Sequence, residues 1–83
     1  MKLTYDPEAD AAYIYISAHI AAGTVKQTYP CEPDGVSGSV NLDFDASGRL
    51  LGIEVIGAKA LLSEDVLRRA EWPATPGVVS EKQ

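Results

Sequence analysis

The stretch SVNLDFDASGRLLGIEVI, residues 39–56, decides the fold. In its first half, Val40, Leu42 and Phe44 alternate with polar residues, and the second half has the same two-residue period. Alternating side chains of this kind point to opposite faces of a β-strand. The intervening Ala-Ser-Gly segment ends in a glycine, which suits a tight turn. The stretch therefore predicts a β-hairpin with one apolar and one polar face.

The chain before this hairpin carries three more segments with strand character. Residues 2–5 and 11–17 alternate, and residues 24–29 form a shorter candidate that Pro30 is expected to end. Asp6 and Pro7 lie between the first two segments and favour a tight turn. These patterns add two or three strands to the hairpin.

A helix is predicted after the hairpin. Ser63 is a suitable N-cap, Glu64 and Asp65 fall in the positive first turn, and Arg68 and Arg69 fall at the negative end. The architecture expected is α+β: a four- or five-stranded antiparallel β-meander with one short C-terminal helix packed on one face. Residues 1–72 are expected to form a single domain, and residues 73–83 a disordered tail.

Charge, hydropathy and cysteine content disfavour several classes of function and predict where the protein is located. Twelve Asp and Glu outweigh seven Lys and Arg, giving a net charge of −5, so direct nucleic-acid binding is disfavoured. The longest nearly apolar stretch, residues 11–22, is too short to span a membrane. The N-terminus lacks the apolar core of a signal peptide, and Cys31 is the single cysteine, so we expect a cytoplasmic protein.

The sharpest chemical motif is Asp43-x-Asp45-x-Ser47-Gly48, with Glu54 six residues after the glycine. This spacing matches the calcium loop of an EF-hand. An EF-hand loop joins two helices, however, whereas both flanks here have a period of two. A hairpin explains the same residues, so we expect no metal site and keep a divalent-metal binder or small enzyme only as a minor alternative.

Other catalytic arrangements are weaker. Cys31 and His19 are the only residues of their types, and nothing in the sequence places them together. No spacing brings two carboxylates into one cleft. We therefore expect no enzyme activity, no catalytic residues and no cofactor.

The outward face of the predicted sheet is the expected interaction surface. Tyr13, Tyr15, Leu50 and Ile56 share the parity of its polar residues, and tyrosine is enriched at interfaces. The alternative is that the tyrosines only form cross-strand pairs that stabilise the sheet. Trp72 has a similar ambiguity, since it either pins the helix end to the core or contacts a partner.

Two segments stand out together: KLTYDPEADAAYI at residues 2–14 and DFDASGRLLGIE at residues 43–54. In this order and spacing they resemble a small prokaryotic family of domains of unknown function, over about residues 1–67. The resemblance implies a compact β-sheet domain without assigned enzymatic activity, some of whose members are suspected antitoxin-like partners of small toxins. It brings no catalytic residues. Asp6, Asp10 and Gly48 would shape turns, and Gly52 would mark a bulge or a close backbone approach.

The first hypothesis is a non-enzymatic protein–protein interaction module that associates with itself, as a dimer, through its sheet or sheet edge. A sheet this small has a thin core and exposed edges, and dimerisation relieves both. The second hypothesis is an antitoxin-like inhibitor whose acidic surface covers a small basic toxin.

Overall fold

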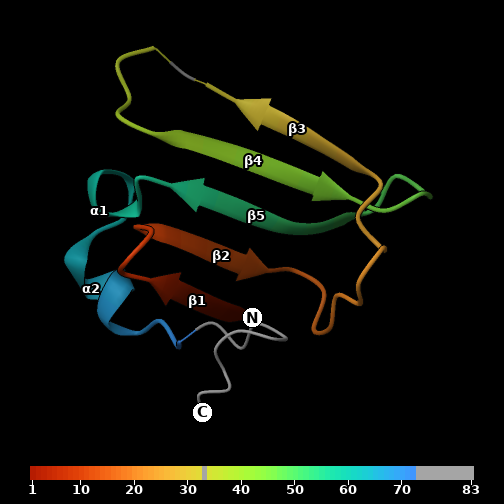
Figure 1. Cartoon of the computed structure of the whole chain (residues 1–83), viewed down its shortest axis with the longest axis horizontal. Coiled ribbons are helices and arrows are strands. Elements are labelled where there is room, and N and C mark those ends of the chain that lie inside the picture. The colour runs from red at the N-terminus through yellow and green to blue at the C-terminus, as the bar shows by residue number, and fades with distance from the viewer. Residues whose placement is uncertain (33, 73–83) are drawn as a thin grey trace.

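The computed structural model describes residues 1–32 and 34–72, so the predicted tail at residues 73–83 lies outside the described part. Five strands and two short helices make up the domain (Figure 1). The strands are β1 (Lys2–Asp6), β2 (Ala11–Tyr15), β3 (Gln27–Cys31), β4 (Ser39–Phe44) and β5 (Leu50–Ile56); the helices are α1 (Ala58–Leu61) and α2 (Glu64–Arg68). Among the described residues, no helix is long and apolar enough to cross a membrane.

The strands form one antiparallel sheet in the order β1-β2-β5-β4-β3, which confirms the α+β class (Figure 1). Strands β3, β4 and β5 follow one another as a meander, and β1 and β2 form a separate hairpin. The two units join where β5 pairs with β2, with Ile53 opposite Ile14. The segment between β2 and β3 therefore crosses to the opposite edge of the sheet. Only the last three strands, β3 to β5, form a meander.

The third strand differs from its prediction. It covers Gln27–Cys31 rather than residues 24–29, and Pro30 lies inside it, opposite Asn41. Proline cannot donate to a sheet ladder, but an edge strand tolerates it because one side of that strand pairs with nothing. Strand β3 is the edge strand of this sheet, which explains why Pro30 does not end it.

The predicted helix forms, but it is short and has a companion. The side chain of Ser63 accepts a hydrogen bond from the backbone N–H of Val66 at 3.3 Å, so it caps α2 as expected. The carboxylate of Asp65 forms exposed ion pairs with Arg68 and Arg69 at 3.5 and 3.1 Å. Before α2, α1 begins directly after Gly57, whose φ of 76° turns the chain out of β5.

Asp10 ties this turn to the first hairpin. Its carbonyl accepts hydrogen bonds from the backbone N–H groups of Gly57 and Ala58, and its Oδ1 accepts from the Tyr5 hydroxyl at 2.7 Å and the Lys59 N–H at 3.0 Å. Asp10 has a φ of 52°, a left-handed conformation that aspartate tolerates. Its hydrogen bond also raises the pKa of Tyr5. Asp10 therefore fixes where the helices sit.

The hydrophobic core is thin and lies over one half of the sheet. The buried hydrophobic side chains among the described residues are Ala12, Leu51, Val55 and Ala58. The partly buried side chains that pack against this core come from β1, β5 and the helical segment: Leu3, Tyr5, Ile53, Leu61, Leu62 and Leu67. No hydrophobic side chain of β3 or β4 belongs to it. The helices thus pack beside the end of the sheet where β1 and β5 finish and β2 begins, and the described helices do not reach β3 and β4 (Figure 1).

Candidate interaction surfaces

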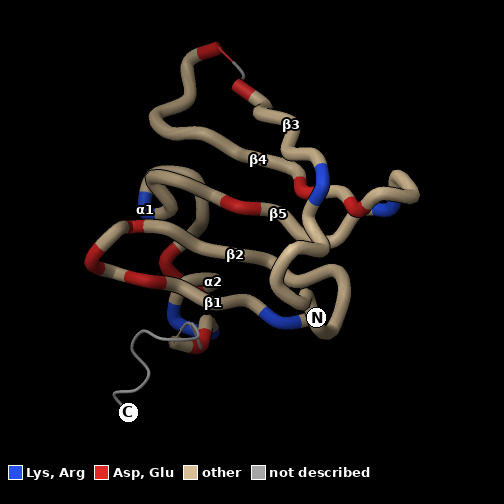
Figure 2. The backbone as a smooth tube through the Cα atoms, turned by 45° about the vertical axis from the view of Figure 1, so that its right-hand side comes forward, with Lys and Arg blue, Asp and Glu red and all other residues tan. Residues whose placement is uncertain are grey.

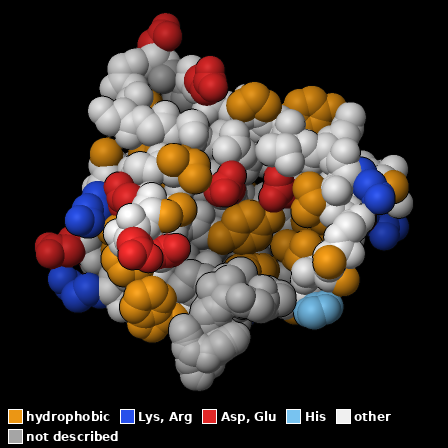
Figure 3. Space-filling view, in the orientation of Figure 1, with side chains coloured by type: hydrophobic (Ala, Val, Ile, Leu, Met, Phe, Trp, Pro, Cys, Tyr) orange, Lys and Arg blue, Asp and Glu red, His pale blue; other side chains and the backbone are white. Residues whose placement is uncertain are grey.

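The face opposite the helices carries a hydrogen-bond network that crosses four strands. The hydroxyl of Tyr13 on β2 donates to Asp43 Oδ2 on β4, and the hydroxyl of Thr28 on β3 donates to Asp43 Oδ1, both at 2.7 Å. Asn41 Nδ2 on β4 donates to Glu54 Oε1 on β5 at 3.1 Å. Figure 3 shows acidic side chains beside hydrophobic ones over the middle of β4, β5 and β2. We call this face, which carries Tyr13, Thr28, Asn41, Asp43 and Glu54, the polar face; on it, acidic side chains accept hydrogen bonds from neighbouring strands.

The Tyr13 ring lies against Gly52 of β5. A Cβ atom built on Gly52 would lie 2.6 Å from Tyr13 Cζ, so only glycine leaves room for the ring. Burial in this position, together with the hydrogen bond to Asp43, raises the pKa of Tyr13 well above its ordinary value. Gly52 is therefore a point of close backbone approach, which is one of the two roles expected for it.

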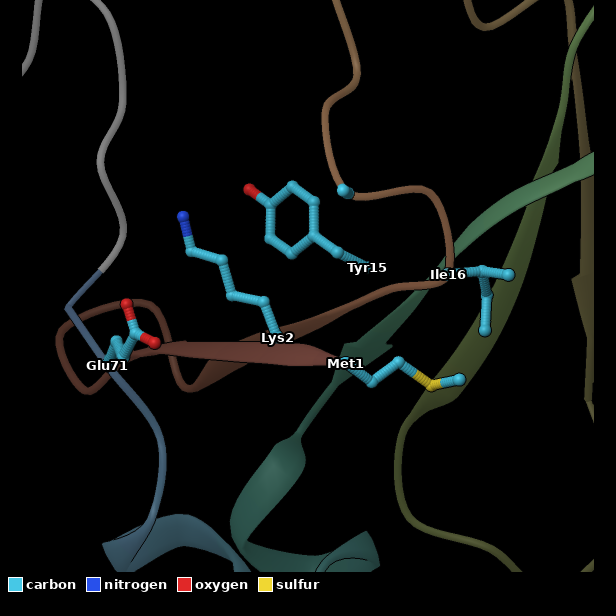
Figure 4. A pocket seen from close by; sticks show the side chains of 6 residues that line it. Met1, Lys2, Tyr15, Ile16 and Glu71 are labelled. Atoms are coloured by element: carbon cyan, nitrogen blue, oxygen red, sulfur yellow. The ribbon is translucent and has the colours of Figure 1, made fainter.

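Tyr15 extends the aromatic part of the polar face towards the N-terminus. Its ring meets the Tyr13 ring edge to face, with centroids 4.8 Å apart, and Lys2 Nζ lies 5.1 Å from its centroid. Figure 4 shows the Lys2 side chain beside the Tyr15 ring, with Glu71 nearby. An open hollow here is lined by Met1, Lys2, Tyr15, Ile16, Ala18 and Glu71. Both tyrosines thus engage partners within the chain.

The other expected interaction residues fall in different places. Ile56 pairs with Ala11 and Ser39 on the polar face. Leu50 lies opposite Phe44, because a register shift between β4 and β5 interrupts the alternation that relates Leu50 to Glu54 in the sequence. A β-bulge of this kind moves a side chain to the other face of its strand. Leu50 therefore lies on the face of Phe44 and not, as predicted, on the polar face.

Trp72 lies just after the bridge between Thr4 and Glu71 and is 73% exposed. It is not among the side chains that pack on the core, so it does not pin the helix end there.

The calcium-like motif is a hairpin turn, as its two-residue period indicates. Asp45 Oδ1 accepts hydrogen bonds from the backbone N–H groups of Ser47 at 2.8 Å and Arg49 at 2.9 Å. These bonds, that of Arg49 first, lower the pKa of Asp45. Asp43 and Glu54 are hydrogen-bonded elsewhere, on the polar face. Within residues 1–32 and 34–72, no group of three or more His, Cys, Asp or Glu side chains is arranged to hold a metal ion.

A second surface lies on the helix side of the sheet, over β3 and β4, where no described helix packs. Its residues are Tyr29 and Cys31 on β3 and Val40, Leu42 and Phe44 on β4, which share one face in the strand register; we call them the β3–β4 hydrophobic surface. Tyr29 is 50% exposed, and the other four side chains are only half-buried. The rings of Tyr29 and Phe44 meet edge to face at 5.5 Å.

The alternation of Val40, Leu42 and Phe44 predicts an apolar strand face but not this uncovered surface. Their alternation says that the face is apolar, but it does not say what covers it. The one available signal is the shortness of the helical segment, which cannot extend over five strands.

Both edges of the sheet are protected. Beside β1, the backbone N–H of Tyr5 donates to the Glu71 carbonyl at 2.9 Å, and the Glu71 N–H donates to the Leu3 carbonyl at 2.8 Å. At the other edge, Pro30 deprives β3 of one backbone donor. Occupied edges and edge prolines both discourage pairing with an added strand.

The model of one protein family, described as protein of unknown function (DUF2283), matches residues 2–59. The match covers more than two thirds of the chain and includes the whole sheet. Comparison with the curated proteins and with the solved structures found no match.

Proposed function

This chain belongs to that family of unknown function, and from its geometry we propose that it is a non-enzymatic protein–protein interaction module that forms a homodimer. The observation that carries the proposal is the apolar face of β3 and β4. Their hydrophobic residues face the same side as the core, but no helix in the described part of the chain packs on them. A face of this kind on a soluble domain is typical of an interaction site.

The dimensions of the elements support this reading. Five strands spaced about 4.8 Å apart and about six residues long present a face of about 430 Å². The helices have four and five residues, which at 1.5 Å per residue and a diameter of about 10 Å cover about 135 Å². The two helices of the described residues can therefore cover at most about a third of the face, and most of it is open to another source of cover.

Sedimentation equilibrium of the full chain tests the proposal. We expect the average mass to rise from that of one chain to that of two as the protein concentration increases from about 5 to about 500 μM, the range in which small interfaces assemble. A single-chain mass at every concentration would refute self-association.

A second candidate function, supported by the polar face, is an antitoxin-like inhibitor of a small basic toxin in a prokaryotic cytoplasm. Asp43 and Glu54 lie beside Tyr13 on this face, and the chain carries a net charge of −5. Acidic and aromatic groups together suit contact with lysine and arginine side chains. A small basic protein encoded by an adjacent gene should bind this chain, and co-expression should restore growth. Binding that is unchanged in an Asp43→Asn/Glu54→Gln variant would reject this role for the face.

A further inference from the structure

The surface best suited to carry self-association is the β3–β4 hydrophobic surface, on which no described helix packs. Resting on the homodimer proposed above, we propose that the β3–β4 hydrophobic surface of one copy packs face to face on the same surface of a second copy. The dimer would then be a two-layer sandwich over its β3–β4 half, with the two sheets about 10 Å apart.

Charge argues for a second copy as the occupant. A two-fold contact sets each surface against itself, so the surface must be self-complementary. The five residues of the β3–β4 hydrophobic surface are all uncharged, and Figure 2 shows no charged residue along β3. On the polar face, Asp43 and Glu54 would meet their own copies in a chain that already carries a net charge of −5. The helix-side face is therefore the one that can pair with itself without opposing like charges.

The edges of the sheet do not compete with this arrangement. The edge at β1 is bonded to Glu71, and the edge at β3 contains Pro30. Continuous sheet formation across two copies needs a run of free donors and acceptors, which neither edge offers in full. Face-to-face packing needs only the side chains that the register already aligns.

The size of the surface sets the strength of the dimer. Two strands of five and six residues present a face of about 10 by 18 Å, smaller than the standard interface of about 800 Å² per partner. The expected dimer is therefore weak and dissociates on dilution. Its hydrophobic centre would be the crossed rings of Tyr29 and Phe44, since aromatic side chains dominate small interfaces.

Adjacent positions in β3 give a matched pair of variants. Tyr29→Lys places a charge within the β3–β4 hydrophobic surface, and because Tyr29 is 50% exposed the isolated fold should tolerate it. Thr28→Lys adds the same side chain one residue away on the polar face, where the lysine ammonium can pair with the Asp43 carboxylate in place of the Thr28 hydroxyl. We expect Tyr29→Lys to raise the dimer dissociation constant at least tenfold and Thr28→Lys to change it less than threefold, measured by sedimentation equilibrium. Circular dichroism of both variants would check that the sheet is retained.

Cys31 supplies an independent readout at the same surface. As the single cysteine, half-buried at the end of β3, it can be followed by its rate of reaction with a small maleimide. We expect this rate to fall as the wild-type concentration rises and to stay constant in Tyr29→Lys.

The outcomes separate the two proposals. A wild-type monomer at all concentrations removes both. A dimer that survives Tyr29→Lys, with a Cys31 rate independent of concentration, leaves the homodimer standing and refutes this surface. A dimer lost in Thr28→Lys but kept in Tyr29→Lys would likewise refute it, because the contact would then lie on the polar face.

Discussion

Gly52→Ala should destabilise the domain because the new methyl group would collide with the Tyr13 ring. The Cβ atom would lie 2.5 Å from Tyr13 Cε2 and 2.6 Å from Cζ, and the ring is held in place by its hydrogen bond to Asp43. Overpacking of this kind costs about 1–3 kcal/mol. At about 2 kcal/mol, a domain of this size should melt about 8–16 °C lower.

A double-mutant cycle isolates the collision. In a Tyr13→Val background the methyl group meets no ring, so Gly52→Ala should become neutral or stabilise by up to about 1 kcal/mol, because glycine is unfavourable within a strand. The coupling energy from urea denaturation at one protein concentration should exceed about 1.5 kcal/mol. Gly23→Ala is the control: it has a φ of 82° and no atom within 4 Å, so its cost should be the same in both backgrounds. Additivity within about 0.5 kcal/mol would show that the ring does not require Gly52.

The remaining predictions concern pH and capping. Because burial raises the pKa of Tyr13 in the folded state, this tyrosine loses its proton at a lower pH in the unfolded chain. The free energy of unfolding should therefore fall as the pH rises above about 10. Tyr13→Phe should make this fall shallower in urea melts, and the pH dependence that is left would come from Tyr5. Hydrogen bonds from Arg49 and Ser47 lower the pKa of Asp45, so its contribution to the free energy of unfolding is present above the unfolded pKa and is lost as the pH falls through the folded pKa. Asp45→Asn should therefore flatten the loss of stability below about pH 5, and an unchanged acid dependence would contradict its role in the turn. Ser63→Ala should lower the free energy of unfolding by about 1 kcal/mol in thermal melts, whereas Ser63→Asp, which keeps an acceptor at the N-cap, should not. Equal losses in the two variants would mean that the capping hydrogen bond does not stabilise the domain.

Local features of the fold could be predicted from the sequence because local physics determines them. The second strand of the hairpin, Leu50–Ile56, forms within the predicted stretch of residues 39–56, since its alternation and the preceding glycine turn are encoded in neighbouring residues. Ser63 caps α2 for the same reason. The strand order could not be obtained in this way. An alternating pattern shows that a strand is half-buried, but it does not choose its neighbours, so the pairing of β2 with β5 had no local signal.

Which residues share each candidate surface is likewise determined by contacts between distant parts of the chain. Tyr13, Tyr15 and Ile56 share a face as their parity indicates, whereas Leu50 does not, because one extra residue in β5 shifts the register. Sequence parity cannot detect such a bulge. The β3–β4 hydrophobic surface was overlooked because an apolar strand face looks the same in sequence whether its own helix or another molecule covers it.

Hydrogen bonds on the polar face order the strands that carry the β3–β4 hydrophobic surface on their other side. On the polar face, Asp43 links β4 to β3 through Thr28 and to β2 through Tyr13, spanning β5 between them. These bonds hold the β3–β4 half in register where no helix packs on it. A surface that is already ordered loses less conformational entropy on binding than one that must be ordered by its partner. The polar network would therefore order the opposite, hydrophobic side for the proposed association with a second copy.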